Sequence, residues 1–171
     1  VAELLPAAFS RVATAGLGVG EWQAVNIRAE ESGMVFEVRQ KGERIGEFSI
    51  PLMGEFNAQN ALHCIVVCRE LGIPKDVIQQ GLSTFKSVKR RLELRGEVNH
   101  IRVYDDFAHH PTAVAETLKA VRQRYPSDRI WAVFEPRSNT CRRRIFEEAF
   151  THAFGAADFI SIARVFGASK L

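Results

Sequence analysis

A change in hydrophobic period after residue 50 constrains most strongly how this chain can fold. Before that point, apolar or β-branched residues alternate with polar ones over residues 22–27, 34–40 and 44–50. Turn sequences, Ser32-Gly33 and Lys41-Gly42-Glu43, separate the three segments. From Asn57 onward, apolar residues recur every three or four positions instead, as in an amphipathic helix. We therefore expect a small antiparallel meander followed by a helix that stops near Gly72 and a second helix with Pro74 in its first turn.

The second half of the chain has a different order of expected elements. Beyond a basic segment at residues 86–91 the pattern predicts strands at 92–98 and 101–105, a helix at 114–124, a strand at 130–134, a helix at 142–154 and a strand at 159–162. The strand at 130–134 is apolar on both faces, as a parallel strand covered by helices requires. This alternation predicts a partial, Rossmann-like doubly wound sheet.

The expected organisation is an α/β chain made of parts of two domains, residues 1–90 and residues 91–171. Its 171 residues suffice for such parts. The first residue is Val1 and not an initiator Met, which suggests a piece of a longer parent chain.

Composition narrows the classes of function. The formal charge of +3 is too small an excess to indicate a nucleic-acid partner. No apolar run reaches the roughly 18 residues of a membrane span, so no membrane partner is expected. Three cysteines without Cys-x-x-Cys spacing indicate neither a disulfide framework nor a zinc site, and a reducing cytoplasm is the simplest location. Basic residues cluster at 86–95 and 137–144, which favours a compact anionic ligand.

The segment Asp105-Asp106-Phe107-Ala108-His109-His110-Pro111-Thr112 gathers two carboxylates and two imidazoles between a strand and a helix. Ligands of open parallel sheets bind beyond the carboxyl ends of strands, and a helix amino terminus there favours an anion. A carboxylate could accept hydrogen bonds from a ribose, and an imidazole could donate to a phosphate.

Three alternatives remain open for this turn. Asp106 could simply cap the helix, with the histidines on the surface. The chain could be a non-catalytic α/β binding module. Asp105, Asp106, His109 and His110 could instead hold a metal ion in a metal-dependent hydrolase, although two adjacent histidines do not easily point at one ion.

Two further segments carry candidate binding groups. Arg137 could hold a carboxylate or phosphate beside Ser138 and Asn139, or this segment could be a solvated loop. Asn57 and Asn60 share a helix face, and an asparagine amide pairs with adenine, although Asn is also a common helix cap. The sequence contains no G-x-x-x-x-G-K-[ST] phosphate loop.

Four segments together, at residues 54–60, 85–93, 105–112 and 135–140, resemble in order and spacing the second half of the Mur ligases. The turn at 105–112 is similar to the branch that attaches alanine to UDP-N-acetylmuramate. Residues 135–140 are similar to the murein peptide ligase branch, which attaches a tripeptide during recycling. The resemblance implies a three-domain parent, of which this chain holds the end of the central ATPase domain and the start of the C-terminal domain.

The resemblance also implies roles for single residues. Asn57 and Asn60 match positions on the adenine side of ATP, and Arg91 matches an arginine that reaches the phosphates. Asp106 matches a ribose-binding aspartate, and His109 matches the residue near the terminal phosphate and the acyl phosphate. Arg137, Ser138 and Asn139 fall where the substrate that carries the amine is held. One departure is Phe56, where the family usually has His.

The implied chemistry is activation of the muramate carboxylate by ATP to an acyl phosphate, with Mg²⁺ offsetting phosphate charge, followed by attack of the peptide amine. The substrates are thus a nucleotide sugar and a peptide. The phosphate loop and the main Mg²⁺ ligands are expected elsewhere in the parent, so this chain is expected to be inactive alone.

Overall fold

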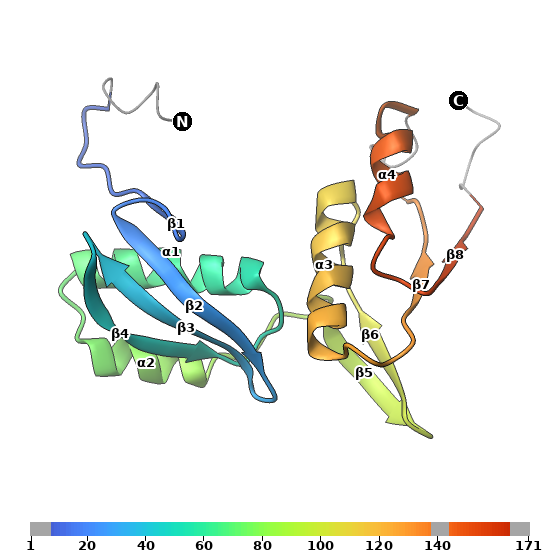
Figure 1. Ribbon diagram of the computed structural model, residues 1–171, viewed down its shortest axis with the longest axis horizontal. Helices are drawn as coiled ribbons and strands as arrows, with labels where there is room; N and C mark the ends of the chain where they lie inside the picture. The colour runs from blue at the N-terminus through green and yellow to red at the C-terminus, as the bar shows by residue number, and fades with distance from the viewer. Residues whose placement is uncertain (1–7, 138–143, 165–171) are drawn as a thin grey trace. The chain divides into compact units, whose positions relative to one another are not determined.

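The computed structural model describes residues 8–137 and 144–164. The chain divides into two compact units, residues 1–85 and residues 86–171, which are described separately (Figure 1). Among the described residues, no helix is both long and apolar enough to cross a membrane.

The first unit is a four-stranded sheet with two helices. Its elements are β1 (Ala15–Leu17), β2 (Trp22–Glu30), β3 (Gly33–Gln40), β4 (Glu43–Ile50), α1 (Glu55–Glu70) and α2 (Lys75–Ser83). The strands lie in sequence order, with β1 and β2 parallel and the other pairs antiparallel. The predicted meander and both helices are confirmed. Pro74 is the residue that caps α2, so this helix begins one position later than expected.

The core of the first unit lies between the sheet and its helices, which cover one face (Figure 1). Alternate residues of β3, namely Met34, Phe36 and Val38, are buried, and Phe36 stacks on Phe48 with ring centroids 6.4 Å apart. Ala58, Ala61, Leu62, Ile65 and Val66 form the buried stripe of α1. The change in sequence period thus corresponds to two apolar faces that bury each other.

The second unit contains two separate two-stranded ladders. Its elements are β5 (Glu93–Val98), β6 (Ile101–Asp105), α3 (Pro111–Arg124), β7 (Trp131–Phe134), a 3₁₀ turn (Arg144–Phe146), α4 (Glu147–Ala153) and β8 (Phe159–Ile162). The first ladder, β5–β6, is an antiparallel hairpin whose turn residues Asn99 and His100 have φ of 50° and 63°, as a two-residue hairpin turn requires. The second ladder, β7–β8, is parallel, as expected. Residues 142 and 143 of the expected fourth helix lie outside the described residues.

A second core forms where α3 and α4 meet β7. Val114, Leu118, Ile130 and Phe154 are buried there. Asp158 fixes the start of this ladder, because its Oδ2 accepts hydrogen bonds from Ile130 N at 2.7 Å and from the Arg122 guanidinium at 2.6 Å. These two donors hold the pKa of the Asp158 carboxyl below its usual value.

The prediction that the strand at 130–134 is buried on both faces is wrong for the described residues. Trp131 and Val133 are 68% and 74% exposed, while Ala132 and Phe134 face the helices. The reason is that α3 and α4 cover one side of β7 only. The strands β6 and β7 also do not pair with each other, and a cavity of about 1090 Å³ lies between them and α3.

Two turn glycines of the first unit give a testable contrast in stability. Gly33 has φ of 134°, and a Cβ there would collide with the carbonyl oxygen of Ile50, whereas Gly42 has φ of 87° and open space around it. We expect Gly42→Ala to cost about 1–2 kcal/mol for the left-handed backbone. Gly33→Ala should cost more than roughly 3 kcal/mol, because β4 must also shift. Urea unfolding of both variants measures the difference, and equal midpoints would contradict this account.

Candidate functional site

The asparagine pair of the first unit lies in the first turns of α1. Asn57 Nδ2 donates to the carbonyl oxygen of Met53 at 2.7 Å, and Asn60 Nδ2 lies 3.5 Å from Asn57 Oδ1. The prediction that both side chains share a helix face is confirmed. The bond to Met53 holds Asn57 in place, while Asn60 is exposed at the end of the pair.

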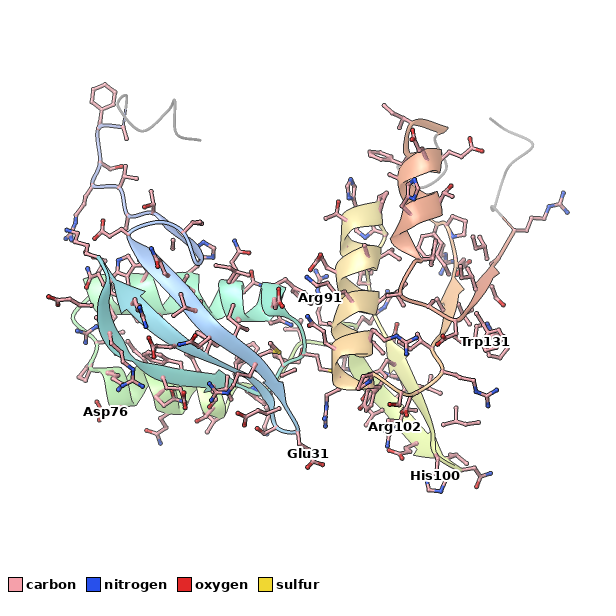
Figure 2. All side chains as sticks on the ribbon, viewed as in Figure 1. Glu31, Asp76, Arg91, His100, Arg102 and Trp131 are labelled. Carbon is pink, nitrogen blue, oxygen red and sulfur yellow. The ribbon has the colours of Figure 1, made fainter. Side chains whose placement is uncertain are left out.

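In the second unit, the entry segment Arg90–Leu92 lies against the turn Asp105–His110, and we call these residues the linker–turn cluster. The amide of Phe107 donates to the carbonyl oxygen of Arg90 at 2.9 Å. Arg90 Nε also lies 3.7 Å from Asp105 Oδ1. Arg91, labelled in Figure 2, is thereby held on the same unit as the predicted residues Asp106 and His109.

Asp106 is the residue that joins the two parts of the cluster. Its Oδ2 accepts the amide hydrogen of Leu92 at 2.8 Å, and its Oδ1 accepts those of Ala108 N at 2.8 Å and Thr117 Oγ1 at 3.3 Å. The bond to Ala108 closes a local turn within the loop. A carboxylate offers about four acceptor positions, so three protein donors leave room for a ligand hydroxyl.

Phe107 contacts both arginines of the entry segment and His109. The guanidinium carbons of Arg90 and Arg91 are 4.9 and 6.0 Å from the centre of its ring, within cation–π range. The ring of His109 meets the same ring edge-on at 4.9 Å. Phe107 is 47% exposed, so burial alone does not explain an aromatic residue here.

The two histidines have different surroundings. His109 Nδ1 lies 2.9 Å from the carbonyl oxygen of Phe107, which leaves Nε2 directed away from this bond. His110 is the residue before the first turn of α3, and its ring packs edge-on against Phe146 at 5.0 Å. The helix amino terminus predicted near Pro111 is therefore present. Of the two histidines, His109 contacts Phe107 and His110 contacts Phe146.

Glu93 ties the entry segment to β5. Its carboxylate accepts the amide of Arg90 at 2.9 Å and also pairs with Arg95 at 2.9 Å. The bond from the Arg90 amide and the nearby positive charges lower the pKa of Glu93. The backbone of Arg90 and of Leu92 has φ of 59° and 46°, an uncommon region for side-chain-bearing residues. These carboxylate bonds hold that conformation.

The alternative metal site is not formed. Within residues 8–137 and 144–164, no group of three or more His, Cys, Asp or Glu side chains is placed to hold a metal ion. Asp105, Asp106, His109 and His110 therefore do not gather around one point, and Asp106 is instead surrounded by hydrogen-bond donors. This arrangement argues against the metal-dependent hydrolase.

The predicted site for the amine substrate is only partly described. Arg137 follows β7, and its Nε lies 3.5 Å from Glu135 Oε1 in an exposed ion pair. Ser138 and Asn139 lie outside the described residues.

Sequence reasoning missed Phe107 within the cluster and Glu93 beside it. Phe107 belongs to the turn motif, but the motif alone assigns it no role, although an aromatic residue between acidic and basic segments is a candidate cation–π partner. Glu93 lies three residues after Arg90, and only the turn geometry reveals its bond to the Arg90 amide.

An open α/β unit with charged groups at the end of a strand is an arrangement typical of nucleotide-using enzymes. The Mur ligase middle domain matches residues 1–68, and the Mur ligase glutamate ligase domain matches residues 90–164. The chain belongs to the Mur ligase family.

Relatives and solved structures agree with this assignment. The chain is 37% identical over 171 residues to the UDP-N-acetylmuramate–L-alanine ligase of Geobacter sulfurreducens, covering 99% of the chain and 37% of that ligase. It is 43% identical over 140 residues to the UDP-N-acetylmuramate–L-alanyl-γ-D-glutamyl-meso-2,6-diaminoheptandioate ligase of Escherichia coli, covering 81% and 30%. The chain thus spans about a third of the length of these relatives.

The mixed α/β fold class is confirmed by structural likeness. The UDP-N-acetylmuramate–alanine ligase of Thermotoga maritima superposes with a TM-score of 0.80 at 24% identity, covering 92% of this chain and 35% of that one. The murein peptide ligase of Psychrobacter arcticus gives 0.58 at 33% identity, covering 90% and 32%.

The lowered pKa of Glu93 predicts how the entry segment responds to acid. A carboxylate whose pKa is lowered in the folded state stabilises the folded protein at pH values above the pKa that the group has when unfolded. This contribution is lost as the pH falls through the folded pKa. We expect the amide NMR signal of Arg90 to be constant above about pH 5 and to shift below it. Glu93→Gln should abolish this titration, and an unchanged titration in that variant would show that another group is responsible.

Proposed function

We propose that this chain is part of a cytoplasmic, ATP-dependent ligase that joins the carboxylate of UDP-N-acetylmuramate to the amine of L-alanyl-γ-D-glutamyl-meso-diaminopimelate during peptidoglycan recycling. The single observation that carries the proposal is the gathering of Arg91, Asp106 and His109 in one cluster of a Mur ligase family member. The identity of 43% to a ligase of that peptide supports the choice of substrate.

The proposed chemistry has two steps. The muramate carboxylate attacks the terminal phosphorus of ATP, which forms an acyl phosphate and releases ADP. The peptide amine then attacks the acyl carbon, the tetrahedral intermediate collapses, and phosphate leaves as the amide forms. Both steps concentrate negative charge on phosphoryl and carboxyl oxygens, so cationic and hydrogen-bonding groups are needed beside them.

Each predicted residue has a role in this proposal. Arg91 offsets phosphate charge with its exposed guanidinium, and His109 donates a hydrogen bond to the transferred phosphoryl group. Asp106 accepts a ribose hydroxyl at its remaining acceptor position. Asn57 and Asn60 meet the adenine edge. The amine substrate is held by Arg137, Ser138 and Asn139.

Mg²⁺ would offset phosphate charge in such a ligase. The described residues contain no acidic cluster that fits this ion. Its ligands are therefore proposed to lie elsewhere in the parent ligase, and no step is assigned to this chain through the metal.

L-Alanine is the second candidate for the amine. The identity of 37% to an alanine ligase extends over 99% of the chain, and the fold is like that of another alanine ligase. Both candidates share the nucleotide-sugar substrate and the acyl phosphate, and they differ only in the amine.

A ligation assay tests the proposal. The complete ligase that contains this chain should release ADP from ATP in the presence of UDP-N-acetylmuramate, and faster with the tripeptide than with L-alanine. The 171-residue chain alone should release none, because its sequence has no phosphate loop. Faster reaction with L-alanine would replace the peptide proposal with its alternative, and no amine-dependent ADP release would refute both.

A charge-conserving substitution tests the role of Arg91. Arg91→Lys keeps the positive charge and loses the planar pair of donors that suits a phosphate. In the complete ligase we expect kcat/KM for ATP to fall by roughly tenfold to a hundredfold, the value of a charged hydrogen bond. Arg124→Lys, on the last turn of α3, should change it less than about twofold. Equal losses in both variants would contradict a specific role for Arg91.

A further inference from the structure

The entry segment is bonded to the second unit by more than one interaction. The Phe107 amide donates to Arg90 O at 2.9 Å, and the Leu92 amide donates to Asp106 Oδ2 at 2.8 Å. Ser87 Oγ donates to Arg91 O at 3.3 Å. These bonds bracket Arg91 on both sides and include its own carbonyl group. The backbone of Arg91 is therefore part of the second unit, although it precedes the first strand of that unit.

On the other side of the connection, the chain is bonded to the first unit. The amides of Thr84 and Phe85 donate to carbonyl oxygens of Gln80 and Leu82, which continue the end of α2. Ser87 is the first residue bonded to the entry segment. Only Lys86 lies between these two sets of bonds, and in the described part of the chain Lys86 makes no hydrogen bond.

The side chain that contacts both Arg91 and His109 is Phe107. Its ring contacts the guanidinium groups of Arg90 and Arg91 and the ring of His109. Two positive groups would repel each other without a screening partner, and the electron-rich face of an aromatic ring supplies one. An aliphatic side chain of similar size would fill the space without this attraction.

We propose that Phe107 is a positioning residue that fixes Arg91 relative to His109 on the second unit, so that the chain pivots at Lys86 and not between Ser87 and Arg91. This inference rests on the proposed function for its catalytic consequence. The contacts of Phe107 with Arg91 and His109, which we call the clamp, are a property of the fold. Arg91 then reaches a phosphate together with His109 as one preorganised pair, which lowers the entropic cost of assembling them.

Amide hydrogen exchange measures the clamp without ATP. In the 171-residue chain, the amides of Leu92 and of residue 107 should be protected, while that of Lys86 should exchange near its intrinsic rate. Phe107→Leu removes the aromatic face, and exchange at Leu92 and at residue 107 should become roughly fivefold to tenfold faster. Phe107→Trp should restore protection to within about twofold, since indole is the stronger cation–π partner. Val88→Ala, at an exposed residue of the same segment, should leave exchange unchanged.

Kinetics of the complete ligase measure the catalytic consequence. Phe107→Leu should lower kcat by roughly fivefold to tenfold with a smaller change in KM for ATP, because misplacement of Arg91 affects the transition state more than nucleotide binding. Phe107→Trp should recover most of kcat. If Phe107 only filled space, Phe107→Leu would instead keep the kcat of the unchanged ligase.

The outcomes separate the two proposals. Unchanged exchange in Phe107→Leu, or equal exchange in the Leu and Trp variants, would overturn the clamp. Altered exchange with unchanged kcat would overturn the positioning role. The expected exchange pattern in a protein whose complete form ligates no amine would support the clamp and refute the proposed function.

Discussion

The carboxylate of Asp106 is the group on which the arrangement of the candidate site depends. It accepts hydrogen bonds from Leu92 in the entry segment, from Ala108 in its own turn and from Thr117 on α3. Three segments separated in sequence are thus joined at one side chain. A buried or half-buried carboxylate needs such donors. The hydrogen bond between Asp106 and the Leu92 amide therefore fixes the turn and the entry segment against each other. Asp106 is therefore structural whatever ligand it also binds.

Periodicity and turn chemistry allowed most of the fold to be predicted from the sequence. The meander, α1 and the Asn99-His100 hairpin follow from local rules, since alternation, helical spacing and positive φ act over a few residues. The burial of β7 could not be predicted in this way. An apolar strand such as Trp131–Phe134 shows which faces can be covered, but not whether another element covers them.

The candidate site was predicted in part for a related reason. The turn at 105–112 stood out because its polar residues are adjacent in sequence, and its resemblance to a family pointed to Asp106 and His109. Two partners of Asp106, Leu92 and Thr117, lie 14 and 11 residues away, and nothing in the sequence spacing specifies them. Phe107 was overlooked because a single exposed aromatic residue has no sequence signal of its own until the arginines that face it are known.

The sequence of this chain is about equally identical to an alanine ligase and to a tripeptide ligase. Overall sequence identity therefore does not decide which amine is the substrate. Both relatives act on UDP-N-acetylmuramate according to their names, so features common to them serve the shared carboxylate chemistry. The linker–turn cluster is a good candidate for such a shared feature, because its proposed ligands are the nucleotide and the phosphate, not the amine. The choice of amine has to be made by residues that touch it, and the resemblance to the family implies this contact in the segment after β7 that includes Arg137.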